Sequence, residues 1–430
     1  MKKLLIAATV VLVSSSPLVL LPMEKELTLT PKQVQKLTQN TTASLTQFKQ
    51  IPKNPRTITT ILTYKNKDLT EFKTSIQADT KLSISAIFWN AKGEPVFQLQ
   101  DGDYVAASQK SIVDDSIYNE KPVDMTLWTK DGLTVYKEPY VLGTEKADSK
   151  LASFKPIKVS QAAQTHAGTY YLVDGEGWIN ASDLSTTDNR IEAVQKVLNE
   201  KYNNQERISV YVKQLDTDRV AAINDEKSMY AASVAKLGVL YYAQERLSQK
   251  KLSLSDEYQY TSAVNGFPGA YDPDGSGKIS KMPDDKNYSL ENLLKAVAQN
   301  SDNVATNILG YYVTNQYDKA FQKSVDKAAA TSWNMDKKEL TARAAGTLME
   351  AVYRQNGDII TYLSSTDYDG ERISKNIDVP VAHKIGDAYD FKHDVAIVYA
   401  DSPFILSIFT DKEGYDKITS IADDVYGILK

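Results

Sequence analysis

The sequence predicts a multidomain protein in which an N-terminal apolar segment precedes two small all-β modules and a larger C-terminal domain of helices and strands. Three observations support this fold class. The chain has 430 residues, a length typical of two to four domains. Short alternating strands broken by Gly, Asp and Asn fill the region before residue 186, whereas helical spacing dominates after it. A basic start and an apolar run open the chain.

The N-terminal segment has the features of an export signal. Met1-Lys2-Lys3 precedes an apolar run over residues 4–13, which residues 14–17 interrupt and residues 18–21 resume. The 19 residues from Leu4 to Pro22 are just enough to span a bilayer. Residues 1–22 are therefore expected to be a cleaved signal peptide or an uncleaved signal anchor, and the sequence leaves that choice open. Membrane contact is expected only through this segment.

Composition excludes several functional classes. The chain has no cysteine, which excludes thiol catalysis, disulfides and thiolate metal sites. Its three histidines, His166, His383 and His393, are too few and too scattered for a metal cluster, so no cofactor or metal is expected. The net charge of −5 and the lack of a basic face predict no nucleic-acid partner.

The region before the C-terminal domain divides into a spacer and two repeated β units. Residues 23–60 are rich in Thr, Gln, Lys and Asn and predict a spacer that buries little surface. Residues 101–108 resemble residues 174–182, since both place Gly and an acid before an aromatic residue, a β-branched residue and an Ala-Ser step. Repeated short strands of this kind predict two small β-barrels, at residues 61–125 and 126–186.

The second β module carries Val135-Tyr136-Lys137, Gly143-Thr144 and Gly177-Trp178. With this set it resembles a GW module, an SH3-like barrel of cell-wall-associated proteins, and an SH3-like barrel is expected for the first module too. The resemblance implies that the modules bind wall polymers or pack on a neighbouring domain. A simple spacing role stays open, because no basic stripe that would hold an anionic polymer is evident.

Residues 187–195 are polar and predict a linker to a domain over residues 196–430. Apolar spacing predicts a helix over residues 190–202 and helical segments over roughly 230–356. Alternation predicts strands over residues 208–212, 220–223, 395–399 and 404–409.

Three short patterns of this domain stand in a fixed order: Ser233-Val234-Ala235-Lys236, Ser301-Asp302-Asn303 and Lys384-Ile385-Gly386. A Ser-x-x-Lys pair alone is weak evidence, because about three arise by chance in a chain of this composition. The three patterns together resemble the motif set of the penicillin-recognising serine enzymes, the class A β-lactamases and penicillin-binding proteins. The resemblance runs from about residue 196 to the end. It implies an α/β fold in which helices flank an antiparallel sheet beside an all-α lobe.

The first pattern has a physical basis for nucleophilic chemistry. Three residues apart on a helix, Ser233 and Lys236 lie on one face, and the start of a helix favours a developing anion. A serine hydroxyl is a weak nucleophile unless a base takes its proton. A lysine can act as that base when burial and a second cation, here Lys384, lower its pKa. Ser233 is therefore the candidate nucleophile and Lys236 the candidate general base.

The resemblance implies catalytic and binding roles for the other two patterns. Ser301 would relay a proton to the leaving group, assisted by Lys384, and Asn303 would hold the acyl amide of the substrate. Asp302 is expected to fix the turn rather than to touch substrate.

The third pattern departs from the family's usual Lys-Thr/Ser-Gly. Gly386 keeps close backbone approach open, and the backbone N–H groups of Asp387 and Ser233 would form the oxyanion hole. Ile385 lacks the hydroxyl that family members use to bind a substrate carboxylate. The carboxylate of Asp387 beside the hole is expected to disfavour acidic substrates.

A second departure concerns deacylation. Class A β-lactamases carry a glutamate on an ω-loop that activates the hydrolytic water. The corresponding stretch, residues 321–340, is about a dozen residues too short for that loop. We assign the role to none of its acids, Asp326, Asp336 and Glu339, and expect slow deacylation.

One segment has a competing interpretation. Residues 272–279 imitate the first half of an EF-hand calcium loop, but position twelve is Pro283 rather than Glu. Residues 275–279 also match a family segment that leads into the helix before Ser301, and we favour that interpretation.

The sequence thus predicts an extracytoplasmic serine hydrolase, secreted or membrane-anchored at the bacterial cell surface, that forms an acyl-enzyme on Ser233. Its expected partners are β-lactams or D-Ala-D-Ala peptidoglycan stem peptides, with cell-wall polymers bound through the β modules. Two alternatives stay open: a D,D-carboxypeptidase or transpeptidase of peptidoglycan, and a catalytically vestigial surface protein that binds the cell wall.

Overall fold

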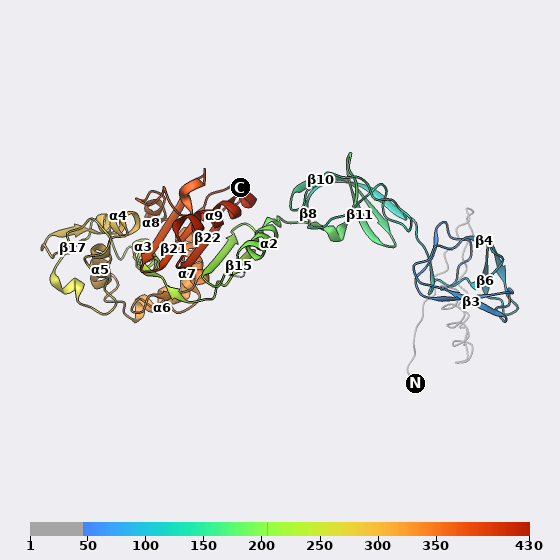
Figure 1. Cartoon of the computed structure of the whole chain (residues 1–430), viewed down its shortest axis with the longest axis horizontal. Coiled ribbons are helices and arrows are strands. Elements are labelled where there is room, and N and C mark those ends of the chain that lie inside the picture. The colour runs from blue at the N-terminus through green and yellow to red at the C-terminus, as the bar shows by residue number, and fades with distance from the viewer. Residues whose placement is uncertain (1–45, 204) are drawn as a thin grey trace, which may run out of the picture. The chain divides into compact units, whose positions relative to one another are not determined.

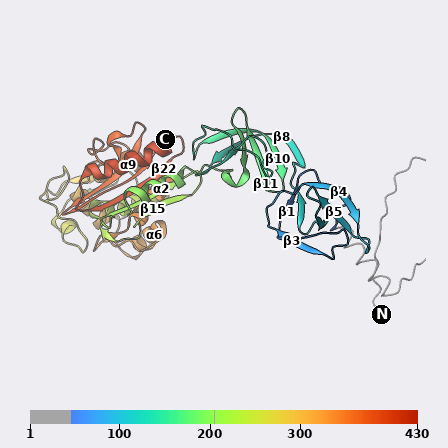
Figure 2. The same ribbon diagram turned by 45° about the vertical axis from the view of Figure 1, so that its right-hand side comes forward.

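The computed structural model describes residues 46–203 and 205–430, which form two compact units with their boundary between Ser116 and Ile117 (Figures 1 and 2). The predicted signal segment, residues 1–22, lies outside the described residues. Within the described ranges, no helix combines the length and the hydropathy that crossing a bilayer requires.

The first unit is all-β in its described part. Strand β1 (Pro55–Thr57) pairs antiparallel with β7 (Ile112–Asp114). Five further strands form an antiparallel sheet in the order β3-β2-β6-β5-β4. They are β2 (Ile61–Tyr64), β3 (Phe72–Ile76), β4 (Ile84–Trp89), β5 (Pro95–Leu99) and β6 (Tyr104–Ala106). Alternating residues such as Phe97, Leu99 and Val105 are buried in its core, as the period of a strand requires.

The second unit begins with another all-β module, a six-stranded antiparallel sheet in the order β13-β8-β10-β11-β12-β9. The strands are β8 (Asn119–Thr129), β9 (Val135–Tyr136), β10 (Pro156–Thr165), β11 (Gly168–Val173), β12 (Gly177–Asn180) and β13 (Leu184–Ser185). A 3-10 turn, η1 (Ala181–Asp183), precedes β13. The expected module boundary at residues 125 and 126 falls inside β8, which runs unbroken across it.

The C-terminal domain contains a five-stranded antiparallel sheet in the order β15-β14-β22-β21-β20. Its strands are β14 (Ile208–Gln214), β15 (Val220–Ile223), β20 (Val381–Ala388), β21 (Phe391–Val398) and β22 (Phe404–Asp411). The four strands predicted from alternation are all present. Strand β20, which carries the Lys384 pattern, lies at the edge of the sheet.

Helices cover both faces of this sheet. Helices α2 (Arg190–Lys201) and α9 (Tyr415–Leu429) pack on the face that presents Val210 and Val212. Helix α7 (Ala342–Gln355) packs on the opposite face, which presents Tyr211. Neighbouring residues of β14 serve opposite faces because successive side chains of a strand alternate. Helix α2 begins at Arg190, so the predicted linker is shorter than residues 187–195.

The remaining helices form the lobe beside the sheet (Figure 1). They are α3 (Leu237–Ser248), α4 (Leu290–Asn300), α5 (Asn303–Tyr312), α6 (Lys319–Ala329) and α8 (Asp358–Leu363). Ser289 caps α4 by accepting a hydrogen bond from the N–H of Asn292, as its side chain predicts. Two strand pairs support the lobe, β16 (Met229–Tyr230) with β19 (Glu339–Leu340) and β17 (Glu257–Gln259) with β18 (Asn287–Ser289). Three 3-10 turns, η2 (Ala232–Lys236), η3 (Ser262–Asn265) and η4 (Ser374–Asn376), complete the domain.

Gly346 on α7 lets this helix approach the sheet closely. A Cβ added there would lie 2.6 Å from Cδ1 of Tyr211 on β14. We expect Gly346→Ala to lower stability by about 1–3 kcal/mol through overpacking, although Ala is the better helix former by about 1 kcal/mol. The matched control is Gly427→Ala on the exposed side of α9, where a Cβ meets no atom within 4 Å. The control should raise the thermal midpoint of the C-terminal domain, and a rise in both variants would contradict this packing.

Candidate active site

The candidate nucleophile Ser233 lies on a tight turn at the start of α3. The turn η2 carries both Ser233 and Lys236 and continues directly into the helix. In a 3-10 turn residues three apart eclipse each other, so the two side chains are aligned more closely than on the predicted α-helix. Ala232, just before the serine, has a left-handed φ of 49°, a conformation that costs a residue with a Cβ. Ser233 itself is 7% exposed.

Lys236 is fully buried and points toward the Ser301 pattern. Its Nζ donates to the carbonyl oxygen of Ser301 at 2.7 Å and to Oδ1 of Asn303 at 2.5 Å. The ammonium group also lies 4.5 Å from the ring centroid of Tyr271. Burial and then the charge of Lys384 lower the pKa of Lys236 well below its ordinary value. The proton on this lysine is therefore held weakly, as a general base requires.

The Ser301-Asp302-Asn303 pattern is the junction between α4 and α5. Ser301 ends α4 with a left-handed φ of 53°, and Asp302 caps α5 by accepting from the N–H of Ala305. The other carboxylate oxygen of Asp302 accepts from the N–H groups of Lys278 and Ile279, at 2.6 and 2.9 Å. Asp302 thus fixes the turn.

Residues 275–279 pack directly on this junction. The Nδ2 of Asn303 donates to the carbonyl oxygen of Asp272 at 2.7 Å, and its N–H donates to that of Ser276 at 2.9 Å. A Cβ on Gly277, whose φ is +126°, would lie 2.2 Å from the carboxylate of Asp302. The Gly-Ser-Gly stretch therefore allows the backbone to hold Asn303 in place.

Lys384 reaches the same junction from the edge of the sheet. Its Nζ donates to Oγ of Ser301 at 2.8 Å and to the carbonyl oxygen of Ile385 at 3.1 Å. Burial lowers the pKa of Lys384 to about 7, against the charge of Asp394, which raises it. Lys384 is thus a group that can exchange a proton with Ser301 near neutral pH.

Gly386 allows β20 to lie against the serine turn. A Cβ at this position would be 2.6 Å from the carbonyl oxygen of Ala231 and 3.1 Å from Cγ2 of Val234. Any larger residue would push the strand and the turn apart.

The carboxylate of Asp387 is bound by side chains of β21, α9 and the loop before η4. It accepts from Arg372 at 2.8 Å and from Lys392 and Tyr415 at short distances. Two cations, Arg372 and Lys392, thus pair with this carboxylate, and Arg372 pairs with Glu371 as well.

A buried histidine braces β20 on its other side. The Nδ1 of His383 lies 3.0 Å from the carboxylate of Asp394, and its Nε2 lies 3.1 Å from Asp369. Burial disfavours the charged ring, but Asp394 and Asp369 outweigh burial and raise the pKa of His383 to about 9. In the part of the chain that the structure describes, the ring nitrogens of His393 contact the carbonyl oxygen of Tyr230 and the N–H of Thr410. Burial lowers the pKa of His393 to about 4.

Sequence reasoning missed two groups beside Lys236. Tyr271 is buried in the segment before α4, and the ammonium groups of Lys236 and Lys338 each lie 4.5 Å from the centroid of its ring. Lys338 comes from the short stretch between α6 and β19. Both are common residue types in stretches without a motif, so only the fold shows that they are neighbours.

The short stretch between α6 and β19 also packs against the serine turn. The indole Nε1 of Trp333 donates to the carbonyl oxygen of Ala235 at 3.1 Å. Of the acids in this region, Asp326 accepts from the N–H of Trp333, whereas Asp336 and Glu339 are exposed.

The contacts of His383 with Asp394 and Asp369 predict that the domain loses stability as pH rises. Because the pKa of His383 is raised, its contribution of about 3 kcal/mol is complete below pH 6.5 and is lost as pH rises through about 9. We expect the unfolding midpoint to fall over this window in the wild type and to change less in His383→Gln. Equal pH dependence in both proteins, measured by thermal denaturation, would contradict a charged His383.

Three comparisons relate the chain to known proteins. A family model described as a domain of unknown function, DUF5776, matches residues 47–113. No curated protein matches the chain. The solved structure of PBP-A shows 14% identity and a TM-score of 0.47, over 55% of this chain and 95% of that one. A β-lactamase from Sphaerobacter thermophilus shows 15% identity and a TM-score of 0.44, over 55% of this chain and 94% of that one. The TLA-1 extended-spectrum β-lactamase shows 18% identity and a TM-score of 0.45, over 56% of this chain and 99% of that one.

The C-terminal domain has a family match of its own. The model of the β-lactamase enzyme family matches residues 189–429, which contain all three patterns and the sheet that carries Lys384. This match extends over more than half of the chain, and the chain therefore belongs to the β-lactamase enzyme family.

Proposed function

We propose that the C-terminal domain is a serine acyl-transfer enzyme in which Ser233 attacks a β-lactam or a D-Ala-D-Ala wall peptide. One observation carries this proposal: the contacts of Ser301 with two buried lysines. Its hydroxyl accepts from Lys384 and its carbonyl oxygen accepts from Lys236. This arrangement joins the three patterns in one site beside the serine turn.

The proton route follows from these contacts. As the bond from Oγ of Ser233 to the carbonyl carbon forms, the hydroxyl proton passes to Nζ of Lys236 in its neutral form. As the carbon–nitrogen bond breaks, Ser301 donates its proton to the leaving nitrogen and regains one from Lys384. Asn303 would orient the acyl amide, and the N–H groups of Ser233 and Asp387 would bind the oxyanion.

The fate of the acyl group depends on the stretch between α6 and β19. Asp336 in this stretch and Glu339 at the start of β19 are exposed, whereas Asp326 on α6 is bound by N–H groups of Gln322 and Trp333. We infer slow deacylation from this arrangement. Slow deacylation also favours a second candidate function, that of a D,D-carboxypeptidase or transpeptidase, which transfers the acyl group of a wall peptide to water or to an amine.

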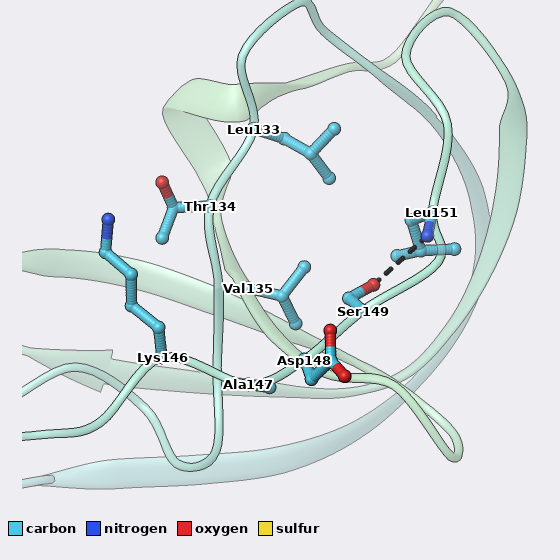
Figure 3. Close-up of a pocket in the computed structure, with 8 residues that line it drawn as sticks. All are labelled: Leu133, Thr134, Val135, Lys146, Ala147, Asp148, Ser149 and Leu151. Atoms are coloured by element: carbon cyan, nitrogen blue, oxygen red, sulfur yellow. Dashed lines mark hydrogen bonds between the residues drawn. The ribbon is translucent and has the colours of Figure 1, made fainter.

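We further propose that the protein acts outside the cytoplasmic membrane and that its β modules, taken as SH3-like barrels, bind wall polymers. The sheet of residues 119–185 has an open pocket of about 270 Å³. Figure 3 shows that the apolar side chains of Leu133, Val135 and Leu151 point toward one another, whereas Thr134 extends to the other side of its backbone. The hydroxyl of Ser149, which also lines the pocket, accepts from the N–H of Leu151. A mixed lining of this kind suits a sugar or peptide with both apolar and hydroxyl or amide groups.

Acylation is tested by incubating the full ectodomain with a fluorescent penicillin and following intact mass. We expect the wild type to gain the mass of the whole drug, because opening the ring releases no fragment, and to keep it for many minutes. Ser233→Ala should gain nothing, whereas the exposed control Ser255→Ala should behave as the wild type. Rapid drug loss without an adduct would indicate a fast β-lactamase, and equal labelling of Ser233→Ala would refute the assignment of the nucleophile.

Wall binding is tested by co-sedimentation with purified peptidoglycan sacculi. The penicillin-blocked protein and Ser233→Ala should both sediment, because the proposed binding surface is separate from the serine. Sedimentation that penicillin abolishes would place binding in the active site instead, and no sedimentation would favour a spacing role.

A further inference from the structure

The ammonium groups of two lysines lie close to the same aromatic ring beside the serine turn. The Nζ atoms of Lys236 and Lys338 each lie 4.5 Å from the ring centroid of Tyr271. Twice that distance, 9 Å, is therefore the largest separation that the two nitrogens can have. Two cations this close in a site of low exposure repel each other strongly, because little water screens them.

Lys338 is fixed at its backbone and at its side chain. Its carbonyl oxygen accepts from the N–H of Ala231, two residues before Ser233, at 2.7 Å. Its Nζ donates to the carbonyl oxygen of Gly269 at 3.0 Å, and the residue is 6% exposed. Gly269 is needed there, since its φ is +84° and an added Cβ would lie 3.0 Å from the backbone of Met335. Lys338 therefore cannot swing away from the site without breaking these contacts.

The other charges that act on Lys236 come from three elements. Lys384 acts from β20, Asp302 from the start of α5, and Lys281 from the loop before β18. Asp302 is the one carboxylate among them, and backbone N–H groups occupy both of its oxygens. Tyr271 contributes a neutral phenol, because burial raises its pKa well above the ordinary value.

Three of these charges act in one direction on the pKa of Lys236, and Asp302 opposes them. Burial lowers its pKa first, Lys384 second, and Lys338 and Lys281 lower it further against the opposing charge of Asp302. Burial also lowers the pKa of Lys338, whereas Asp336 raises it. The carbonyl oxygen of Gly269 and the face of Tyr271 both favour a cation at Lys338.

We propose that Lys338 is a positioning residue whose charge keeps Lys236 in its neutral, proton-accepting form. The proposal rests on the proposed function, in which Lys236 takes the proton of Ser233. The short stretch between α6 and β19 would then supply a cation that tunes acylation. A purely structural role, in which Lys338 only ties residue 269 to the site, makes different predictions.

The test uses Lys338→Met, Lys338→Arg and, as a matched control, Lys337→Met at the exposed neighbouring position. The rate of acylation by a fluorescent penicillin is measured by intact mass from pH 6 to pH 10 on the full ectodomain. Removing a nearby positive charge makes Lys236 easier to protonate, so Lys338→Met should move the rising limb of the profile to higher pH. At pH 7 its acylation should be about 3–10 times slower.

Lys338→Arg keeps the positive charge, so the rising limb of its pH profile should stay at the wild-type position. Lys337→Met should match the wild type at every pH. If Lys338→Met and Lys338→Arg are slowed equally at every pH, Lys338 has only a structural role and the proposal is overturned. An acid shift in Lys338→Met would overturn it as well.

A second measurement does not depend on activity. The lysine side-chain carbons are titrated by NMR, with the Lys236 signal assigned by its absence in Lys236→Arg. The midpoint of Lys236 should rise in Lys338→Met and stay in Lys338→Arg, and an unchanged midpoint in Lys338→Met would overturn the proposal. If the midpoint rises but the wild type forms no adduct, the tuning is supported and the proposed acyl transfer is what fails.

Discussion

The C-terminal domain is organised around two ammonium groups that are buried beside one serine. An isolated buried ammonium costs several kcal/mol, so each needs strong acceptors in place of water. Ser301 serves both, with its carbonyl oxygen to Lys236 and its hydroxyl to Lys384. Its left-handed backbone at the end of α4 presents these two acceptors at the junction, and Asp302 locks that conformation by capping the next helix. The edge strand, the serine turn and the helical lobe all meet where these two hydrogen bonds are made.

The contacts that would best stabilise the two buried lysines conflict with the protonation states that acyl transfer needs. A carboxylate in contact with either lysine would stabilise the fold, but it would also keep that lysine protonated and so unable to accept the proton of a nucleophile. Among the described residues, the recorded partners of both ammonium groups are carbonyl, amide and hydroxyl oxygens. The carboxylates nearby are bound elsewhere, Asp302 by backbone N–H groups and Asp387 by Arg372 and Lys392. The charges of the two ammonium groups are therefore only partly compensated, and both groups hold their protons weakly.

Local patterns in the sequence were sufficient for features that depend on neighbours along the chain. Helical periodicity predicted α2, alternation predicted the strands of the sheet, and the three-residue spacing aligned Ser233 with Lys236. The meeting of Ser301 with Lys384 joins residues 83 apart, and only the resemblance of the motif set suggested it. Neither Lys338 nor the partners of Asp387 could be found, because nothing in their own stretches distinguishes them from exposed residues. The boundary that the sequence predicts between the β modules, at residues 125 and 126, falls inside β8, which runs from Asn119 to Thr129.

Trp333 gives the domain an optical reporter of its own. It is the single tryptophan in the sequence of residues 189–430, since the other three, Trp89, Trp128 and Trp178, precede this region. Its indole is buried and hydrogen-bonded to the carbonyl oxygen of Ala235, within the turn that carries Ser233. A Cβ on Gly238, at the start of α3, would lie 2.7 Å from the same indole nitrogen, so the ring also tightly contacts the helix that follows the turn. Any rearrangement of the turn must alter the surroundings of this fluorophore, and intrinsic emission can therefore follow events at the serine without a label.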